Sequence, residues 1–119
     1  NVAIETGIGT DEVTVADVAI PGFLRIATGV GDDALDVSDV HTARKASIDV
    51  GDGEDTVHLT STSFGGKFRF FAKGGDDDVT LAGGTFAGKV GLNGGTGSDA
   101  LVTSGDAFTE PPIVIGFER

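Results

Sequence analysis

The chain has no cysteine, methionine, tryptophan or tyrosine, and only 3 of its 119 residues are proline. Without cysteine it forms no disulfide and offers no thiol nucleophile or thiolate metal ligand. No apolar run approaches the length needed to span a bilayer, so we expect no membrane insertion. Basic residues are scarce, 8 against 19 acidic ones, and the resulting net charge of −11 argues against nucleic acid and anionic membranes as partners.

Glycine is abundant, with 20 residues, and much of it belongs to a motif that recurs every 22 residues. The five copies are "TGIGTDEVTV" (6–15), "TGVGDDALDV" (28–37), "VGDGEDTVHL" (50–59), "AKGGDDDVTL" (72–81) and "GGTGSDALVT" (94–103). The glycine and aspartate of each G-x-D core keep the same step: Gly9 and Asp11, Gly31 and Asp33, Gly53 and Asp55, Gly75 and Asp77, Gly97 and Asp99. No insertion interrupts the period, which is typical of a repeat architecture.

Written in rows of 22, the chain alternates apolar and polar residues at positions 2 to 4 and again at 13 to 15 of each row. Period-two alternation indicates strands with one buried face, and no stretch has a helical apolar period. The fourth column, for example, contains Ile4, Ile26, Ile48, Phe70, Leu92 and Val114. One row cannot bury a face alone, but stacked rows can. The sequence therefore predicts an all-β, single-stranded, right-handed parallel β-helix (a β-solenoid) of about five coils; a β-sandwich would not need equal spacing.

We expect one domain over residues 1–119, with repeats at 1–22, 23–44, 45–66, 67–88 and 89–110 and a partial sixth coil at 111–119. Neither end carries a polar cap of the kind that keeps solenoids soluble. The apolar "IVI" at 113–115 lies in the half coil after Pro111 and Pro112. We therefore expect a piece of a longer protein, and a module able to associate end to end through its open strand edges.

The aspartate column poses an electrostatic problem. Neighbouring carboxylates one coil apart would repel by about 1 kcal/mol in water and about 3.5 kcal/mol at an effective dielectric constant of 20. Two arrangements would offset this repulsion. Each carboxylate could accept backbone N–H bonds in its own turn, as in an Asx-turn. Alternatively, a divalent cation could lie between coils, and calcium suits carboxylate and carbonyl oxygens in a glycine-rich turn.

"GGTGSDALV" (94–102) resembles the calcium-binding nonapeptide G-G-x-G-x-D-x-U-x of RTX (repeats-in-toxin) proteins at every defined position. The other copies keep the G-x-D-x-U core but replace the first glycine by Thr6, Thr28, Val50 or Ala72, and the fourth has Lys73 for the second. RTX repeats recur every nine residues. This chain has one such turn per 22 residues, so only one side of each coil is RTX-like.

In that family the aspartate side chain and loop carbonyls of successive turns hold calcium between them. The resemblance thus implies four calcium sites, flanked by Asp11/Asp33, Asp33/Asp55, Asp55/Asp77 and Asp77/Asp99, with loop carbonyls around Gly9, Gly31, Gly53, Gly75 and Gly97. It also implies a secreted or cell-surface bacterial protein, similar to solenoid segments of large adhesins. Lys73 would place a cation beside the two sites that include Asp77.

Most basic residues lie at the start of the rows, away from the acidic turns. They form a possible ligand face on one strand: Arg25, Lys45, Lys67, Arg69 and Lys89. Such a face could bind an anionic glycan or the acidic surface of a partner, or simply be solvated beside neighbouring acids. Phe23 and Phe71, which alternation places outward there, favour binding.

We expect no enzyme. Asp36, His58 and Thr80 share an outward column, but nothing beside them supplies an oxyanion hole. The favoured function is a calcium-stabilised structural module. The alternatives are a carbohydrate-binding or carbohydrate-active β-helix that uses the basic face, and an inert scaffold whose turns hold no metal.

Overall fold

The structure, a computed structural model, describes residues 1–118, so the last residue of the expected sixth coil, Arg119, lies outside it. Within that range the chain is all-β, and it has no helix of the length and apolarity that crossing a membrane requires. The first sheet contains β1 (Val2–Glu5), β3 (Leu24–Ala27), β5 (Ala46–Asp49), β8 (Phe68–Phe71), β11 (Val90–Asn93) and β14 (Ile113–Ile115).

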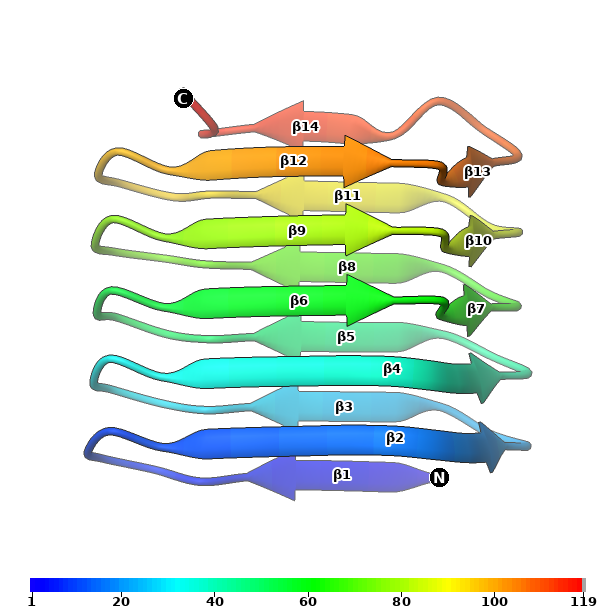
Figure 1. Cartoon of the computed structure of the whole chain (residues 1–119), viewed down its shortest axis with the longest axis horizontal. Coiled ribbons are helices and arrows are strands. Elements are labelled where there is room, and N and C mark those ends of the chain that lie inside the picture. The colour runs from blue at the N-terminus through cyan, green and yellow to red at the C-terminus, as the bar shows by residue number, and fades with distance from the viewer. Residues whose placement is uncertain (119) are drawn as a thin grey trace.

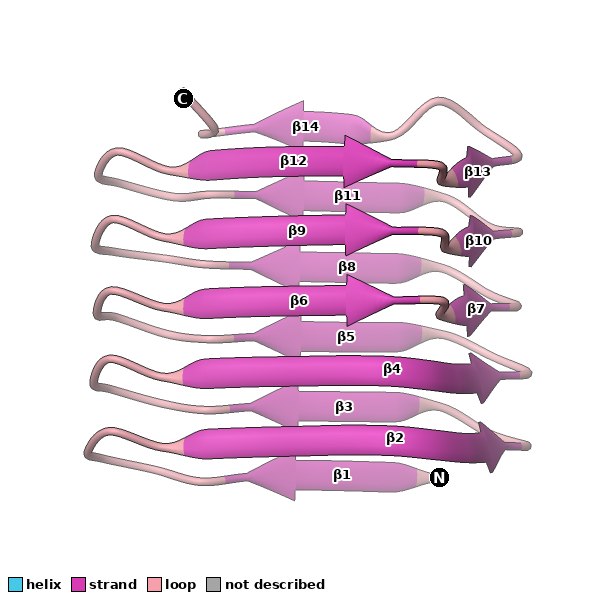
Figure 2. Cartoon of the chain, viewed as in Figure 1, coloured by secondary structure: helices cyan, strands magenta, loops and turns pink. Residues whose placement is uncertain are grey.

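The second sheet has a long arm and a short arm, which meet in the longest strands (Figures 1 and 2). The long arm contains β2 (Glu12–Ile20), β4 (Ala34–Thr42), β6 (Thr56–Thr60), β9 (Asp78–Ala82) and β12 (Ala100–Ser104). The short arm stacks on the end of β4 and contains β7 (Ser63–Phe64), β10 (Thr85–Phe86) and β13 (Ala107–Phe108).

Every pairing is parallel, and each residue pairs with the one 22 positions further along the chain. Ile4 pairs with Ile26, Ile26 with Ile48, and Ile48 with Phe70. In Figure 1 the near strands run to the right, the far strands run to the left, and each circuit rises by one coil, which is right-handed winding. The predicted fold, a parallel β-solenoid of about five coils, is confirmed.

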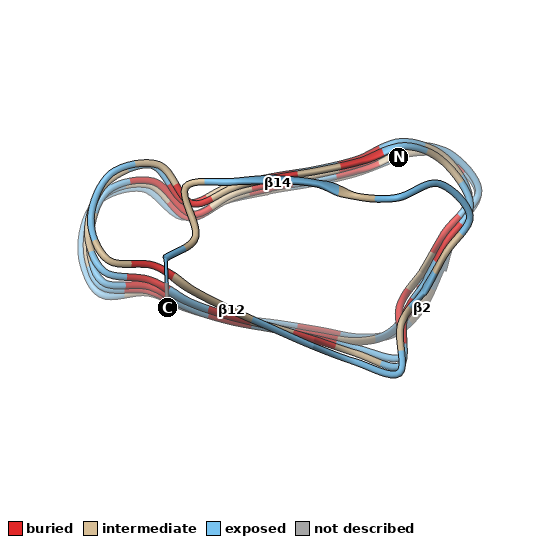
Figure 3. Cartoon of the chain, turned by 90° about the horizontal axis from the view of Figure 1, so that it is seen from above, coloured by how far each residue is buried: buried red, intermediate tan, exposed pale blue. Residues whose placement is uncertain are grey.

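Seen along its axis, the coil is a flattened triangle (Figure 3). The third corner, between the long and short arms, is made by residues with positive φ: Asp17 (55°), Asp39 (52°), Ser61 (52°), Gly83 (65°) and Gly105 (67°). Aspartate and glycine reach this left-handed region at low cost, so the column suits a bend.

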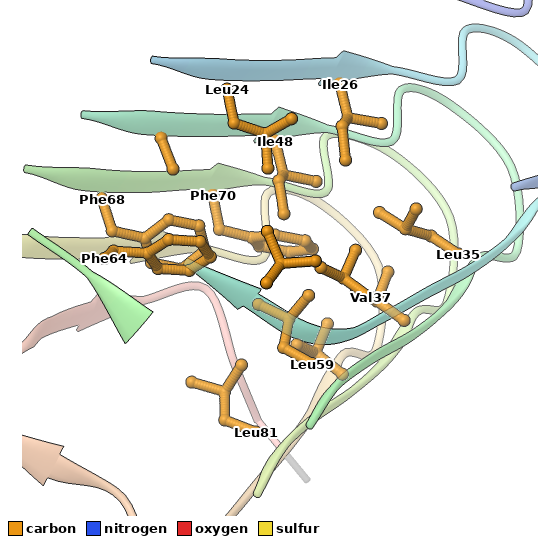
Figure 4. Close-up of a cluster of buried hydrophobic side chains, with 14 of the residues drawn as sticks. Leu24, Ile26, Leu35, Val37, Ile48, Leu59, Phe64, Phe68, Phe70 and Leu81 are labelled. Atoms are coloured by element: carbon orange, nitrogen blue, oxygen red, sulfur yellow. The ribbon is translucent and has the colours of Figure 1, made fainter. Parts of the chain in front are cut away.

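The core is a set of apolar ladders from the predicted columns (Figure 4). The burial pattern of β6 alternates strictly, with Val57 and Leu59 inside and Thr56, His58 and Thr60 outside. Phenylalanine rings occupy the corner beside the first sheet. The ring centroids of Phe64 and Phe68 lie 4.7 Å apart in a stacked arrangement, and those of Phe86 and Phe108 lie 4.9 Å apart.

The last coil covers the core incompletely. Ile113 is 68% exposed, Val114 43% and Ile115 56%. An apolar strand with this much exposed surface is typical of a site that contacts another protein. End-to-end association through it stays a prediction.

Candidate functional site

The five glycine-rich turns stack directly on one another, at the edge where each strand of the first sheet leads into the long arm of the second (Figure 1). Backbone hydrogen bonds join successive turns. The N–H of Gly9 donates to the carbonyl of Val30 (2.9 Å), and the N–H of Gly53 donates to the carbonyl of Gly74 (2.8 Å). The turns are therefore continuous with the sheets, and their side chains are held in columns.

Glycine is required at the centre of each turn for two reasons. The φ angles of Gly9, Gly31, Gly53, Gly75 and Gly97 run from 111° to 136°, a region that other residues rarely adopt. The chain also packs too closely for a side chain. A Cβ added to Gly53 would lie 2.0 Å from the carbonyl oxygen of Gly31, one coil below.

We expect Gly53→Ala to destabilise the protein by at least about 3 kcal/mol, because it combines backbone strain with a clash against backbone. Gly91→Ala is the matched control. It lies on β11, and an added Cβ there meets no atom within 4 Å. The control is expected to change stability by less than about 1 kcal/mol in urea unfolding. Equal stabilities of the two variants would contradict this account of the turn.

The aspartates that follow these glycines point inward. Asp33 is 3% exposed, Asp55 1%, and Asp77 and Asp99 are fully buried, whereas Asp11 on the first coil is half-buried. In the last four along the chain, one carboxylate oxygen accepts the N–H of the aspartate one coil earlier. These bonds run from Asp11 N–H to Asp33 Oδ1 (2.8 Å), Asp33 to Asp55 (2.8 Å), Asp55 to Asp77 (2.8 Å) and Asp77 to Asp99 (2.9 Å).

These bonds differ from the Asx-turn that the sequence suggests as the metal-free alternative, because they link neighbouring coils. They form a buried ladder of carboxylates, one per coil, and a carboxylate that accepts a backbone N–H is partly stabilised in its charged form. The ladder therefore provides a hydrogen bond for one of the two carboxylate oxygens of each of these four aspartates.

The other carboxylate oxygen is the unusual feature of the site. The Oδ2 atoms of Asp11, Asp33, Asp55 and Asp99 are buried, and within residues 1–118 they have no hydrogen-bond partner. Burial of a polar atom without a partner is costly, and for a charged oxygen the cost is larger. A bound proton or a bound cation would satisfy these oxygens.

The protonation equilibria reflect this burial. Loss of hydration, together with repulsion from neighbouring carboxylates, raises the pKa of Asp55 from 3.8 to about 7. The same causes raise the pKa of Asp77 to about 7. In both cases the hydrogen bond from the backbone N–H of the preceding coil opposes the rise. Near neutral pH these two groups are therefore poised between holding a proton and releasing it.

A second set of acids lies on the outside of the turns and has a different role. Asp32 Oδ1 accepts the N–H of Glu54 (2.9 Å), and Asp76 Oδ1 accepts the N–H of Ser98 (2.8 Å). Both aspartates are exposed. They connect each turn to the coil above it, whereas the buried aspartates connect it to the coil below.

No group of three or more His, Cys, Asp or Glu side chains in the described part of the chain is arranged to hold a metal. A cation between coils would thus have two carboxylates at most and would need main-chain carbonyl and water oxygens besides. Calcium accepts such a mixed set of oxygens. Lys73, which the sequence places beside Asp77, forms an ion pair with Asp49 on β5, with Nζ 3.0 Å from Oδ2.

The basic residues gather on the outer surface of the first sheet, as the alternation predicts. Arg25, Lys45, Lys67 and Arg69 line one hollow of about 580 Å³ together with Phe23. Lys89 is exposed at the start of β11 and does not line it. The Lys45 ammonium lies 5.8 Å from the centre of the Phe23 ring, within the range of a cation–π contact.

The outward column of Asp36, His58 and Thr80 is also formed, because these residues pair in register across β4, β6 and β9. Asp36 and His58 are exposed to solvent, and this column does not line the hollow formed by Arg25, Lys45, Lys67 and Arg69. Its position fits an exposed polar ladder.

Comparison with known proteins adds no further constraint: no family model, no curated protein and no solved structure matches the chain.

Proposed function

We propose that this β-solenoid is a non-catalytic structural module of a secreted or cell-surface bacterial protein, and that calcium bound between its stacked G-x-G-x-D turns stabilises it. The observation that carries the proposal is the set of buried Oδ2 atoms of Asp11, Asp33, Asp55 and Asp99, which have no hydrogen-bond partner within residues 1–118. Calcium bound between Asp33 and Asp55, for example, would balance the negative charge of these buried oxygens.

The location follows from the same chemistry. Calcium sites made of few charged ligands bind weakly and fill only where the ion is abundant, as it is outside cells. A rigid stack of coils whose turns tighten when calcium is present would suit a stalk or an adhesive segment. The absence of cysteine is compatible with this location, although it does not require it.

Isothermal titration calorimetry tests the proposal by counting ions. We expect calcium to bind with measurable heat, with up to four ions per chain, one for each pair of neighbouring aspartates. Magnesium should bind more weakly, because it demands a compact octahedral set of oxygens. A titration without heat at millimolar calcium would contradict the calcium sites and leave the inert scaffold.

A further inference from the structure

One column of side chains on the outer surface of the first sheet alternates between large and small. It runs from Arg25 on β3 through Ser47 and Arg69 to Gly91 on β11, each paired in register with the next. Neighbouring strands of a sheet lie about 4.8 Å apart, so the two arginines stand about 10 Å apart along the solenoid axis. The small residues leave spaces beside them.

Two hollows correspond to these spaces. The first, about 580 Å³, lies over Ser47 between the two arginines. The second, about 260 Å³, lies over Gly91 and is lined by Arg69, Phe71 and Asn93 as well as by apolar residues of β14. Because Arg69 lines both, the two hollows lie end to end along the solenoid axis, one on each side of this arginine, and together they are called the trough.

The trough concentrates positive charge on a protein with a net charge of −11. Arg25 is paired with Glu5. Lys45, Lys67 and Arg69 form no ion pair within residues 1–118. Lys45 and Lys67 occupy the same position of adjacent coils, about 5 Å apart. Both side chains line the same hollow, so a bound anion would reduce the repulsion between their ammonium groups.

Aromatic rings flank the trough on both sides of Arg69. Phe23 lines the first hollow and Phe71 the second, and both are half-buried. Rings held in this way offer flat apolar surface beside polar groups. This combination of cations, aromatic rings and small hydrogen-bonding side chains suits a sugar chain, which presents apolar ring faces, hydroxyls and spaced charges.

We propose that this trough binds an anionic glycan whose carboxylate or sulfate groups recur once per disaccharide, with the glycan lying along the solenoid axis. The two-coil step of the arginines is comparable to the length of a disaccharide. Arg69 and Arg25 bind charged groups one disaccharide apart, with Arg25 exchanging Glu5 for the ligand, and Lys45 and Lys67 add positive charge to the first hollow between them. A nucleic acid fits less well, because it carries one charge per nucleotide and the rest of this acidic surface would repel it.

Binding of hyaluronan oligosaccharides, which carry one carboxylate per disaccharide, tests the proposal by calorimetry at low and at physiological ionic strength. Oligosaccharides of κ-carrageenan, which carry one sulfate per disaccharide, are the probe for sulfate, and neutral dextran is the uncharged control. The proposal expects one of the two anionic probes to bind and dextran not to bind. Hyaluronan binding assigns carboxylate as the recognised group, and binding of the κ-carrageenan oligosaccharides alone assigns sulfate.

Three variants separate binding in the trough from general electrostatic attraction. Arg69→Glu should weaken binding roughly tenfold or more, because it removes a fork of donors and adds a repelling charge. Arg44→Glu changes the net charge equally, but Arg44 lines neither hollow, so its effect should stay within about twofold. Ser47→Phe fills the first hollow without a change of charge and should also weaken binding.

A fourth variant tests the length of the trough. Gly91→Leu should weaken binding of long oligosaccharides and spare a tetrasaccharide, since an added side chain there meets open space and fills only the second hollow. Each variant is first shown to unfold at the temperature of the parent protein. Failure of both anionic probes to bind at low ionic strength, or equal losses for Arg44→Glu and Arg69→Glu, would overturn the proposal. The calcium titration is independent of either outcome.

Discussion

Replacing Asp55 with asparagine is expected to stabilise the calcium-free protein at neutral or higher pH and to destabilise the calcium-loaded one. The amide oxygen can still accept the N–H of Asp33, as the carboxylate does at 2.8 Å. The substitution removes a buried negative charge, which should raise the free energy of unfolding without calcium by about 1–2 kcal/mol.

With calcium present, Asp55→Asn is expected to lower the free energy of unfolding instead, because Asp55 flanks two of the four proposed sites. Each site filled at 100 times its dissociation constant stabilises the folded state by about 2.7 kcal/mol, so loss of two sites costs about 5 kcal/mol. Urea unfolding of both proteins with calcium and with a chelator measures the four free energies of the cycle.

Asp36→Asn is the control for the loss of one negative charge. Asp36 is exposed on β4, outside the turns. Its replacement by asparagine should change the free energy of unfolding by less than about 0.5 kcal/mol with or without calcium. If Asp55→Asn destabilised the protein by the same amount with and without calcium, the carboxylate would serve only the ladder of hydrogen bonds, and the calcium sites would be contradicted.

The second large effect is a pH dependence of the calcium-free protein. Asp55 and Asp77 have pKa values of about 7 in the folded state, against an ordinary value of 3.8. Between these values the folded protein binds more protons than the unfolded chain. The stabilisation is therefore fully present below about pH 4, is lost as the pH rises through 7, and changes little above that.

Each group contributes a slope of at most about 1.4 kcal/mol per pH unit, so together they lower the free energy of unfolding by several kcal/mol between pH 4 and pH 7. Calcium should reverse this trend, because its carboxylate ligands must be deprotonated and its affinity rises with pH. Chemical unfolding at a series of pH values, with calcium and with a chelator, gives both curves. A calcium-free protein that became more stable over this range would contradict the buried position of the two carboxylates.

The sequence was sufficient to predict the fold because its period is unbroken. Apolar residues such as Ile26 and Ile48 recur at 22-residue spacing, and a parallel ladder is the arrangement that stacks them. The glycines were predictable for a similar reason, since residues of one type at one column must share a backbone conformation. Gly31 and Gly53 do share one, with φ of 133° and 136°.

The hydrogen bonds of the aspartates could not be predicted in the same way. The sequence places Asp55 in a turn, but it does not say whether its carboxylate bonds to its own turn or to Asp33 in the coil below. That choice depends on which way the side chain points, and thus on a difference of a few ångströms between coils. The 22-residue period alone therefore does not predict the inward direction of the carboxylate or the burial of its second oxygen.

The sequence also contains signals for two features that its apolar period does not predict. The third corner is visible as a column of turn-forming residues, of which Asp17, Asp39 and Ser61 adopt positive φ. The alternation of Arg69 with Ser47 and Gly91 can also be seen in the sequence, because the three residues are 22 positions apart. Its meaning depends on the outward direction of all three residues and on the hollows that the small ones leave.

Thermal unfolding of the unmodified protein in millimolar calcium, compared with the same protein in a chelator, tests the central claim most directly. Several ions, each contributing up to about 2.7 kcal/mol, should raise the melting temperature by well over 10 °C for a domain of this size. Equal melting temperatures in the two solutions would contradict the claim. The buried carboxylates would then be satisfied by protons, and the solenoid would be stable without metal.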